Sequence, residues 1–302
     1  MKRRDFIKTI LASGFALFFP NLILPKKTLA ANENYDLVAV RGGNPDAMFY
    51  AAMKELGGIE KYVRKGQTVV VKPNIGWDVP PERAANTNPL LVGAIVKACI
   101  DAGAKKVYVF DNTCDNWQRA YSNSGIERAV KQNGGEMVPG NFERYYSEVE
   151  IPNGIKLKKA KVHELILSSD VFINVPILKH HSSARLTISM KNHMGIVWDR
   201  FYWHRNDLHQ CIADFAAYRK PDLNIVDAYR AMHRNGPRGV SEADVIELKA
   251  LIISQDIVAA DSAAAKFLNY EPQEIPYIKI AAEQKKLGNY DLSKLRIKRI
   301  AI

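Results

Sequence analysis

Short apolar strands alternate with amphipathic helices along most of this chain, and that alternation constrains its fold more than any other feature. The runs "LVAV", "TVVV" and "KVYVF" begin at residues 37, 68 and 106, and helical patterns separate them. The helix expected between the last two begins at Asn88-Pro89 and ends at Gly103. Strands that alternate with helices in this way pair in parallel. We predict an α/β fold with a mostly parallel, Rossmann-like sheet and helices on both faces.

One segment, residues 139–162, breaks the alternation and predicts a hairpin insertion. Its sequence alternates polar and apolar side chains around Pro152-Asn153-Gly154, a combination typical of turns. After it, "DVFINVPIL" predicts one further strand and "ARLTISMKNHMG" predicts a helix. No repeat or low-complexity linker divides the chain, so we expect a single α/β domain over residues 31–302.

The first 30 residues have the layout of an export signal. Arg3 and Arg4 precede "DFIK", an apolar stretch covers residues 9–25, and a small-residue site ends at Ala30. The arginine pair resembles the twin-arginine signal, which implies the twin-arginine translocase as a partner during export. The alternative is a membrane anchor, but the 17 residues of the apolar stretch fall short of the roughly 20 that a span needs. We expect a cleaved signal and a location in the periplasm or cell envelope.

Charge and cysteine content argue against two classes of function. The full chain has a net charge of +11, but six basic and one acidic side chains lie in the first 30 residues, which leaves +6 for the rest. No long basic run with stacking aromatics accompanies this charge, so we expect no nucleic-acid partner. Cys99, Cys114 and Cys211 lack C-x-x-C spacing, and an iron–sulfur cluster usually takes four thiolates. We expect no such cluster from the chain's own cysteines.

Polar side chains follow the predicted strands at the points where the strands end. Lys72 and Lys179 follow two of them, and Asp111 and Asp227 follow two others. The carboxyl ends of parallel strands share one edge of a sheet, where α/β folds bind their ligands. An ammonium group directly after a buried strand must reach water, a carboxylate or an anion. We therefore expect a small anionic ligand at this edge, although for Asp111 an ordinary turn or helix cap is the alternative.

The segment "LKHHSSARLTISMKNHMG" adds further lysines and histidines to the same region. The residues that we expect to act on a ligand, as anion partners or proton carriers, are Lys179, His180, His181, Lys191 and His209. The residues that we expect to hold a ligand or cofactor are Lys72, Asn74, Asn192, Asp227 and Asp261. Neighbouring side chains of an extended strand point to opposite sides, so we expect only one of the two adjacent histidines to face the ligand.

Metal binding and nucleophilic catalysis stay open as alternatives. The histidines, His193 among them, could ligate a metal ion, but their spacing matches no established zinc motif and leaves the metal unspecified. Thr187 lies four residues before Lys191, on the same face of the expected helix, as a lysine-activated hydroxyl would. No second motif supports hydrolysis. The aromatic segment "WDRFYWH" forms either a lid over the site or part of the core, and for Trp198 and Trp203 we favour the core.

Several ordered blocks of the chain resemble the domain of unknown function 362 family. They include "VVVKPNIGW", "DVFINVPILKHHSSARLTISMKNHMG" and "LNIVDAYRAMHRNGPRG", and the resemblance covers essentially all of the chain after the signal. Some members of that family carry ferredoxin-like cysteine clusters, which this chain does not. The family is distantly similar to the nickel-pincer lactate racemase superfamily, in which a lysine and a histidine hold an organometallic, nicotinate-derived cofactor. That similarity implies that Lys179 and His180 or His181 contact such a cofactor.

Two kinds of function follow from these patterns. The first is an exported enzyme or cofactor protein that binds an anionic ligand, with or without a metal ion, in a crevice lined by lysine, histidine and aspartate. The second is a non-catalytic protein of the cell envelope that scavenges an anionic solute or helps to mature an exported redox partner. Both use the same crevice, and only turnover of the ligand separates them.

Overall fold

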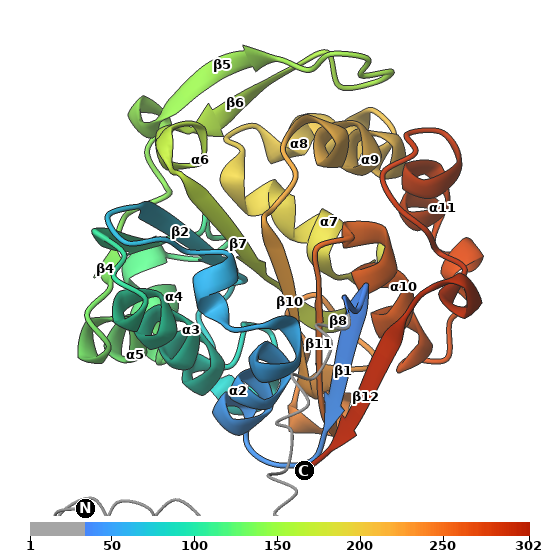
Figure 1. Ribbon diagram of the computed structural model, residues 1–302. Coiled ribbons are helices and arrows are strands. Elements are labelled where there is room, and N and C mark those ends of the chain that lie inside the picture. The colour runs from blue at the N-terminus through green and yellow to red at the C-terminus, as the bar shows by residue number, and fades with distance from the viewer. Residues whose placement is uncertain (1–33) are drawn as a thin grey trace, which may run out of the picture. The chain divides into compact units, whose positions relative to one another are not determined.

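The computed structural model describes residues 34–302, and Figure 1 shows how their helices and strands are arranged. The expected export signal lies outside the described residues. A ten-stranded sheet forms the centre, with β12-β1-β11-β10-β7-β2-β3-β4 as its main order and β8 and β9 joined to β10. Within residues 34–302, no helix has the length and apolar character needed to cross a bilayer.

The strands of this sheet are short, apart from two that run for ten residues each. They are β1 (Leu37–Arg41), β2 (Thr68–Pro73), β3 (Lys106–Val109), β4 (Glu136–Met137), β7 (Val171–Val175), β8 (Ile177–His181), β9 (Arg185–Thr187), β10 (Leu223–Met232), β11 (Val245–Ser254) and β12 (Ile297–Ala301). The neighbours β10-β7-β2-β3-β4 are parallel, as are β1 and β12, whereas β11 runs antiparallel to both β1 and β10. The predicted α/β fold with a mostly parallel sheet is confirmed.

Helices cover both faces of the sheet, as the alternation of strands and helices predicts (Figure 1). They are α2 (Pro45–Leu56), α3 (Pro89–Asp101), α4 (Trp117–Asn123), α5 (Ile126–Gln132), α6 (Glu164–Ser168), α7 (Ser189–Asn192), α8 (Arg200–Arg205), α9 (Leu208–Tyr218), α10 (Ile257–Lys266) and α11 (Pro276–Glu283). A 3₁₀ turn, η4 (His193–Ile196), extends α7. Asn88 caps α3 by accepting a hydrogen bond from the backbone N–H of Leu90 at 3.0 Å.

Two hydrophobic cores lie on opposite faces of the sheet, because successive strand residues point to opposite sides. In β2, Val69 and Val71 belong to the core beneath α2, α3 and α5, and Val70 between them belongs to the core beneath α9, α10 and α11. All three side chains are fully buried. Burial on both faces explains why the strands are continuous apolar runs. The parallel pairing of β10, β7, β2 and β3 places their carboxyl ends on one edge.

Two local predictions differ from the structure around residues 170–195. The run "DVFINVPIL" is not one strand, because it breaks at Pro176 into β7 and β8; proline has no N–H to continue the ladder. The predicted helix over 184–195 is partly wrong, since its first residues form β9, antiparallel to β8, and only α7 and η4 are helical. The turn into β9 uses Arg185 at a φ of 63°. The short β8–β9 hairpin therefore replaces the start of the predicted helix, and Lys179, His181 and Thr187 belong to it.

The predicted hairpin insertion is present. Its strands β5 (Tyr146–Glu150) and β6 (Lys159–His163) pair antiparallel in a separate two-stranded sheet. Figure 1 shows this hairpin projecting beyond the central sheet, above α8.

Candidate functional site

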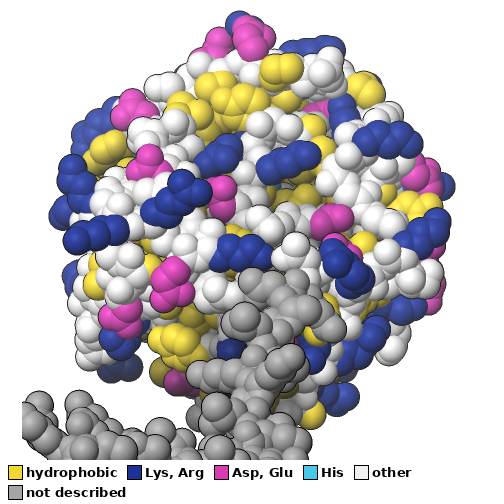
Figure 2. Space-filling view, in the orientation of Figure 1, with side chains coloured by type: hydrophobic (Ala, Val, Ile, Leu, Met, Phe, Trp, Pro, Cys, Tyr) yellow, Lys and Arg dark blue, Asp and Glu magenta, His cyan; other side chains and the backbone are white. Residues whose placement is uncertain are grey.

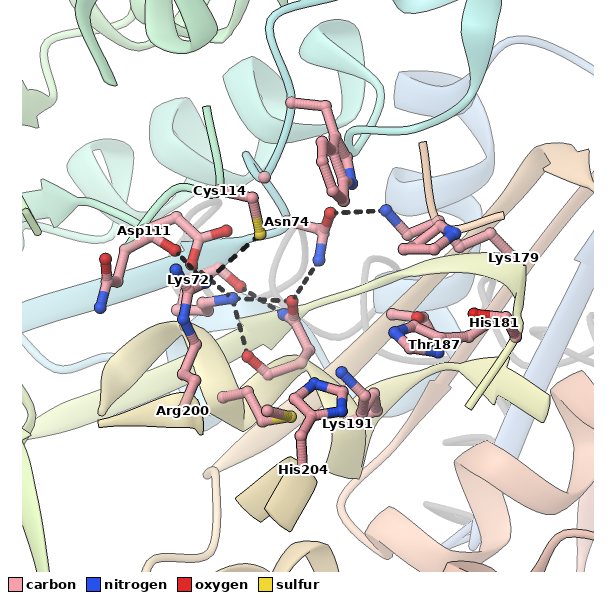
Figure 3. Close-up of a pocket in the computed structure, with 18 of the residues that line it drawn as sticks. Lys72, Asn74, Asp111, Cys114, Lys179, His181, Thr187, Lys191, Arg200 and His204 are labelled. Atoms are coloured by element: carbon pink, nitrogen blue, oxygen red, sulfur yellow. Dashed lines mark hydrogen bonds and ion pairs between the residues drawn. The ribbon is translucent and has the colours of Figure 1, made fainter. Parts of the chain in front are cut away.

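A cavity of about 430 Å³ lies where β2, β3 and β8 end. Residues from several strands, helices and loops line this cavity, and Figure 3 shows how their side chains face one another. Its lining is predominantly polar or charged and consists of Lys72, Asn74, Gly76, Trp77, Asp111, Asn112, Cys114, Lys179, His181, Ser182, Thr187, Lys191, Asn192, Met194, Gly195, Arg200, Phe201, His204 and Pro237.

A buried ion pair forms one wall of the cavity. The Nζ of Lys72 lies 3.0 Å from Oδ1 of Asp111, and both side chains are almost fully buried. Lys72 also donates to the backbone oxygen (2.8 Å) and Oδ1 (2.7 Å) of Asn192. The other Asp111 oxygen accepts a hydrogen bond from the backbone N–H of Ile75 at 2.6 Å. Burial lowers the pKa of Lys72, and the Asp111 carboxylate opposes that shift. The three N–H groups of the Lys72 ammonium thus have three acceptors: Oδ1 of Asp111 and the backbone oxygen and Oδ1 of Asn192.

Gly195 makes that pair possible, because it passes directly over the two charged groups. A Cβ at this position would overlap both Oδ1 of Asp111 and Nζ of Lys72. Its backbone oxygen accepts a hydrogen bond from the N–H of Asn112 at 2.9 Å, which ties η4 to the end of β3. Only a residue without a side chain fits this approach.

Lys179 forms the opposite wall and is also buried. Its Nζ donates to Oδ1 of Asn74 at 3.1 Å and to the backbone oxygen of Ala85. Burial lowers the pKa of this lysine to about 7, with the nearby Lys191 adding to the effect. No carboxylate is within ion-pair distance of it in the described part of the chain. Near neutral pH it is therefore divided between the ammonium and the neutral amine.

Lys191 is the cation of this cavity that the protein leaves without a partner. Its residue is 8% exposed, and no group among residues 34–302 accepts a hydrogen bond from its Nζ or forms an ion pair with it. Burial lowers its pKa to about 8. Asp261 fixes the position of α7, the helix that carries Lys191. Its carboxylate accepts hydrogen bonds from the backbone N–H groups of Ser189 (2.7 Å) and Met190 (3.1 Å) at the start of this helix. A buried ammonium without a protein acceptor needs a ligand or water.

His181 points into the cavity, whereas its neighbour His180 does not. The Nδ1 of His181 accepts hydrogen bonds from the backbone N–H groups of Ser183 (3.1 Å) and Ala184 (3.2 Å), so the ring carries its proton on Nε2. Burial lowers its pKa to about 2, and the ring is neutral at physiological pH. His204 on α8 stacks against it with centroids 6.2 Å apart.

The structure brings six of the ten residues predicted for the site to the cavity: Lys72, Asn74, Lys179, His181, Lys191 and Asn192. The other four, His180, His209, Asp227 and Asp261, lie outside it. His180 accepts a hydrogen bond from the N–H of Gly236 at 3.1 Å, and His209 stacks on Tyr277.

The two carboxylates lie outside the cavity because backbone donors occupy them. Asp227 accepts hydrogen bonds from the N–H groups of Asn88 (2.7 Å) and Tyr229 (3.0 Å), which fixes the start of α3 against β10. Burial raises its pKa to about 6, and that of Asp261 to about 7. Both therefore position backbone rather than contact the cavity.

Sequence reasoning missed Arg200 as a residue of the cavity. Its guanidinium donates to the backbone oxygens of Asn112 (2.6 Å) and Thr113 (2.8 Å), and lies 3.6 Å from Sγ of Cys114. No predicted strand ends near Arg200 in the sequence, so the positions of strand ends could not place this residue at the cavity. The aromatic segment that contains it gave the signal, since Phe201 and His204 also line the cavity. Trp203, by contrast, is buried in the core, as expected, whereas Trp198, for which the core was also favoured, is only half-buried.

The charges of the cavity are strongly unequal. Its lining has four basic side chains, Lys72, Lys179, Lys191 and Arg200, and one carboxylate, Asp111. Low-dielectric walls strengthen the field of such a cluster. The arrangement attracts anions, and Lys179 can exchange a proton near pH 7 because both of its forms are populated there.

The described residues contain no cluster of three or more histidine, cysteine, aspartate or glutamate side chains that could hold a metal ion. His193, one of the histidines considered for a metal, packs between the rings of Phe172 and Phe215 instead.

The chain is similar to two solved structures. The lactate racemase apoprotein from Thermoanaerobacterium thermosaccharolyticum has a TM-score of 0.50 at 13% identity, over 78% of this chain and 58% of the racemase. A protein from Thermotoga maritima has a TM-score of 0.49 at 12% identity, over 75% of this chain and 60% of its own. The chain thus spans less than two thirds of the length of either, and the racemase likeness concerns the fold alone.

Sequence comparison gives a nearer relative and a family. A thylakoid-associated protein of Synechocystis sp. is 28% identical over 244 residues, which are 78% of this chain and 73% of the relative. The family model described as a domain of unknown function, DUF362, matches residues 69–266, which include Lys72, Asp111, Lys179, Lys191 and Arg200. The chain therefore belongs to the DUF362 family.

Proposed function

We propose that this protein binds a small organic anion in the cavity at the carboxyl ends of β2, β3 and β8. One observation carries the proposal: among residues 34–302, no group accepts a hydrogen bond from the Nζ of Lys191 or pairs with it, and this lysine lies in a cavity lined by four basic side chains and one carboxylate. A largely buried ammonium group that no protein group pairs with is costly, and a bound anion removes most of that cost. Lys72 cannot be the main partner, since Asp111 and Asn192 already occupy it.

The neighbours of Lys191 favour a carboxylate. Figure 3 shows Thr187 and His181 on the same side of the cavity as Lys191, and Asp111, Cys114 and Arg200 on the other. The hydroxyl of Thr187 and the Nε2–H of His181 add neutral donors to the charged one. Lactate, the substrate that names the structurally similar racemase, is a small carboxylate of this class.

We propose, in addition, that the protein is an enzyme in which Lys179 exchanges a proton with the bound anion. Its pKa of about 7 gives it a neutral amine that can accept a proton and an ammonium that can return one. Asn74 orients the amine through its hydrogen bond at 3.1 Å. Binding without turnover is the alternative, and prolonged incubation of the protein with each bound anion, followed by mass spectrometry and chiral chromatography, separates the two.

An organometallic cofactor of the kind implied by the resemblance has two residues that fit it. Lys179 and His181 alternate along β8, so both face the cavity, and the donors around Lys191 would contact an anionic group of such a cofactor. When bound, it would supply electrophilic chemistry that amino-acid side chains lack. Elemental analysis and mass spectrometry of protein purified from its source test for it.

The binding experiment uses isothermal titration calorimetry of the full chain with lactate, malonate and inorganic phosphate, and with neutral lactamide. We expect the carboxylates to bind and lactamide not to. Lys191→Met should weaken binding about tenfold or more, as expected for the loss of a charged hydrogen bond. Lys105→Met, which changes an exposed lysine outside the cavity, is the matched control. Equal affinity of both variants for every anion would contradict the proposal.

We also propose export by the twin-arginine route, supported by the sequence of the first 30 residues. Replacing Arg3 and Arg4 by lysine should leave the uncleaved precursor in the cytoplasm of the source organism. Cell fractionation with an antibody to the chain measures this. Unchanged export of the double variant would exclude the twin-arginine route.

A further inference from the structure

A second hollow, of about 770 Å³, lies beside the anion cavity and is continuous with its lining. Residues of the β5–β6 hairpin and of the segment leading into α8 form this groove. Asn112, Arg200 and Phe201 line both hollows, so the guanidinium of Arg200 stands at the boundary between them. A ligand that extends from Lys191 across the cavity to Arg200 would reach the groove there.

The charged side chains of the groove already have partners within the chain. On the hairpin, Lys161 pairs with Glu143, and Lys159 lies 3.1 Å from Glu148. Lys158 donates to the backbone oxygen of Gly154. On the α8 side, Asp199 accepts a hydrogen bond from the backbone N–H of Tyr202 at 3.2 Å, and Arg200 donates to two backbone oxygens. The groove thus lacks the unpaired cation that distinguishes the first cavity.

Besides these paired charged groups, the groove exposes aromatic side chains. Phe201 is 75% exposed and Tyr202 is 40% exposed, and Trp198 lines the groove beside them. Figure 2 shows hydrophobic side chains gathered at the top of the view, where the hairpin and α8 lie in Figure 1. Contiguous exposed aromatic surface in a groove is typical of a binding site for an apolar group.

We propose that the ligand of this protein is an amphiphilic anion, whose charged head binds at Lys191 and whose apolar chain lies in the groove between the hairpin and α8. This inference rests on the proposed anion site and adds the class of ligand to it. The head satisfies the unpaired ammonium, and the chain covers the aromatic side chains. The charged head thereby meets a basic lining, and the apolar chain meets an aromatic one.

The test compares carboxylates that differ in chain length alone. Butanoate and octanoate are titrated into the full chain by calorimetry, below the concentration at which octanoate forms micelles, with neutral octanamide and octyl phosphate as further arms. A fully buried methylene contributes about fourfold in affinity, so four half-buried ones should make octanoate bind roughly 15-fold more tightly than butanoate. Octanamide should bind far more weakly than octanoate. Octyl phosphate against octanoate distinguishes a phosphate head from a carboxylate head.

The variants Trp198→Ala and Tyr202→Ala should lower the ratio of octanoate to butanoate affinity to about twofold or less. Tyr202 is partly exposed, so its truncation keeps the test available if the tryptophan variant does not fold. Leu167→Ala, which truncates an exposed apolar side chain on α6 outside both hollows, should leave the ratio unchanged.

The outcomes separate the inference from the function on which it rests. If butanoate and octanoate bind equally well, the anion site stands and the amphiphilic ligand is excluded. If no carboxylate or phosphate of any length binds, the proposed function itself fails. If octanamide binds as tightly as octanoate and neither groove variant affects it, octanoate binds to another apolar surface and the inference is wrong.

Discussion

The substitution Gly195→Ala tests whether the cavity depends on the buried pair of Lys72 and Asp111. The new Cβ would overlap Oδ1 of Asp111 and Nζ of Lys72, so one of the two charged groups must move. Neither can do so cheaply, because their side chains are 1% and 3% exposed. Moving either one leaves the other as a buried charge without its counterion.

The magnitude follows from that loss. Removing one partner of a buried ion pair typically costs about 3–5 kcal/mol of folding free energy. A domain of this size has an unfolding entropy of about 2.1 cal/mol/K per residue, so the melting temperature should fall by about 5–9 °C. Affinity for lactate should fall as well. Lys72 is hydrogen-bonded to Asn192 of α7, so a displaced Lys72 shifts the helix that carries Lys191.

Gly76→Ala provides the matched control. Gly76 lines the same cavity, but a Cβ there would meet its nearest neighbours, Oδ1 of Asn74 and Sγ of Cys114, at 3.7 and 4.0 Å, which are ordinary contact distances. Differential scanning calorimetry of both variants and of the unchanged chain measures the effect. The reasoning is refuted if Gly195→Ala melts with the unchanged chain, or if Gly76→Ala falls by the same amount.

Two further predictions concern titration and positioning. Because the pKa of Lys191 is lowered to about 8, its ammonium form is lost above that pH, and affinity for lactate should fall by up to about tenfold per pH unit above 8. The native protein then binds fewer protons than the unfolded chain, whose lysine titrates near 10.5, so the free energy of unfolding without ligand should rise between pH 8 and 10.5. Calorimetry across this range, with Lys191→Met as control, checks both trends, and pH-independent affinity would contradict the assignment. Asp261→Ala should weaken lactate binding, since it releases the start of α7, whereas Asp227→Ala should lower the melting temperature without changing affinity. The opposite pattern would show that Asp227 contacts the ligand.

The polar edge of the sheet was predictable because it depends on local patterns. Apolar runs mark buried parallel strands. The residue after each run lies at the shared carboxyl edge of the sheet, and this placement does not depend on contacts with distant parts of the chain. Lys72 and Lys179 were found in this way. The opposite orientations of His180 and His181 also follow from strand geometry alone.

Other residues could not be placed by pattern, because their roles depend on which partners reach them. Asp227 was predicted to follow a strand as Asp111 does, but it lies inside β10, and backbone N–H groups of Asn88 and Tyr229 occupy its carboxylate. Asp111 instead meets Lys72. A carboxylate has the same appearance in the sequence whether it caps a backbone segment or pairs with a cation.

The sequence by itself determined the α/β class, the parallel edge and the presence of several cations there, since these follow from the periodicity of apolar residues and from the direction of the strands. Only the tertiary structure decided which cation lacks a partner. Lys72 and Lys191 both line the cavity and are largely buried, and long-range contacts satisfy the first, whereas no group among residues 34–302 pairs with the second. Hydrogen bonding and burial are properties of neighbours in space, and those neighbours lie up to 120 residues apart in the sequence.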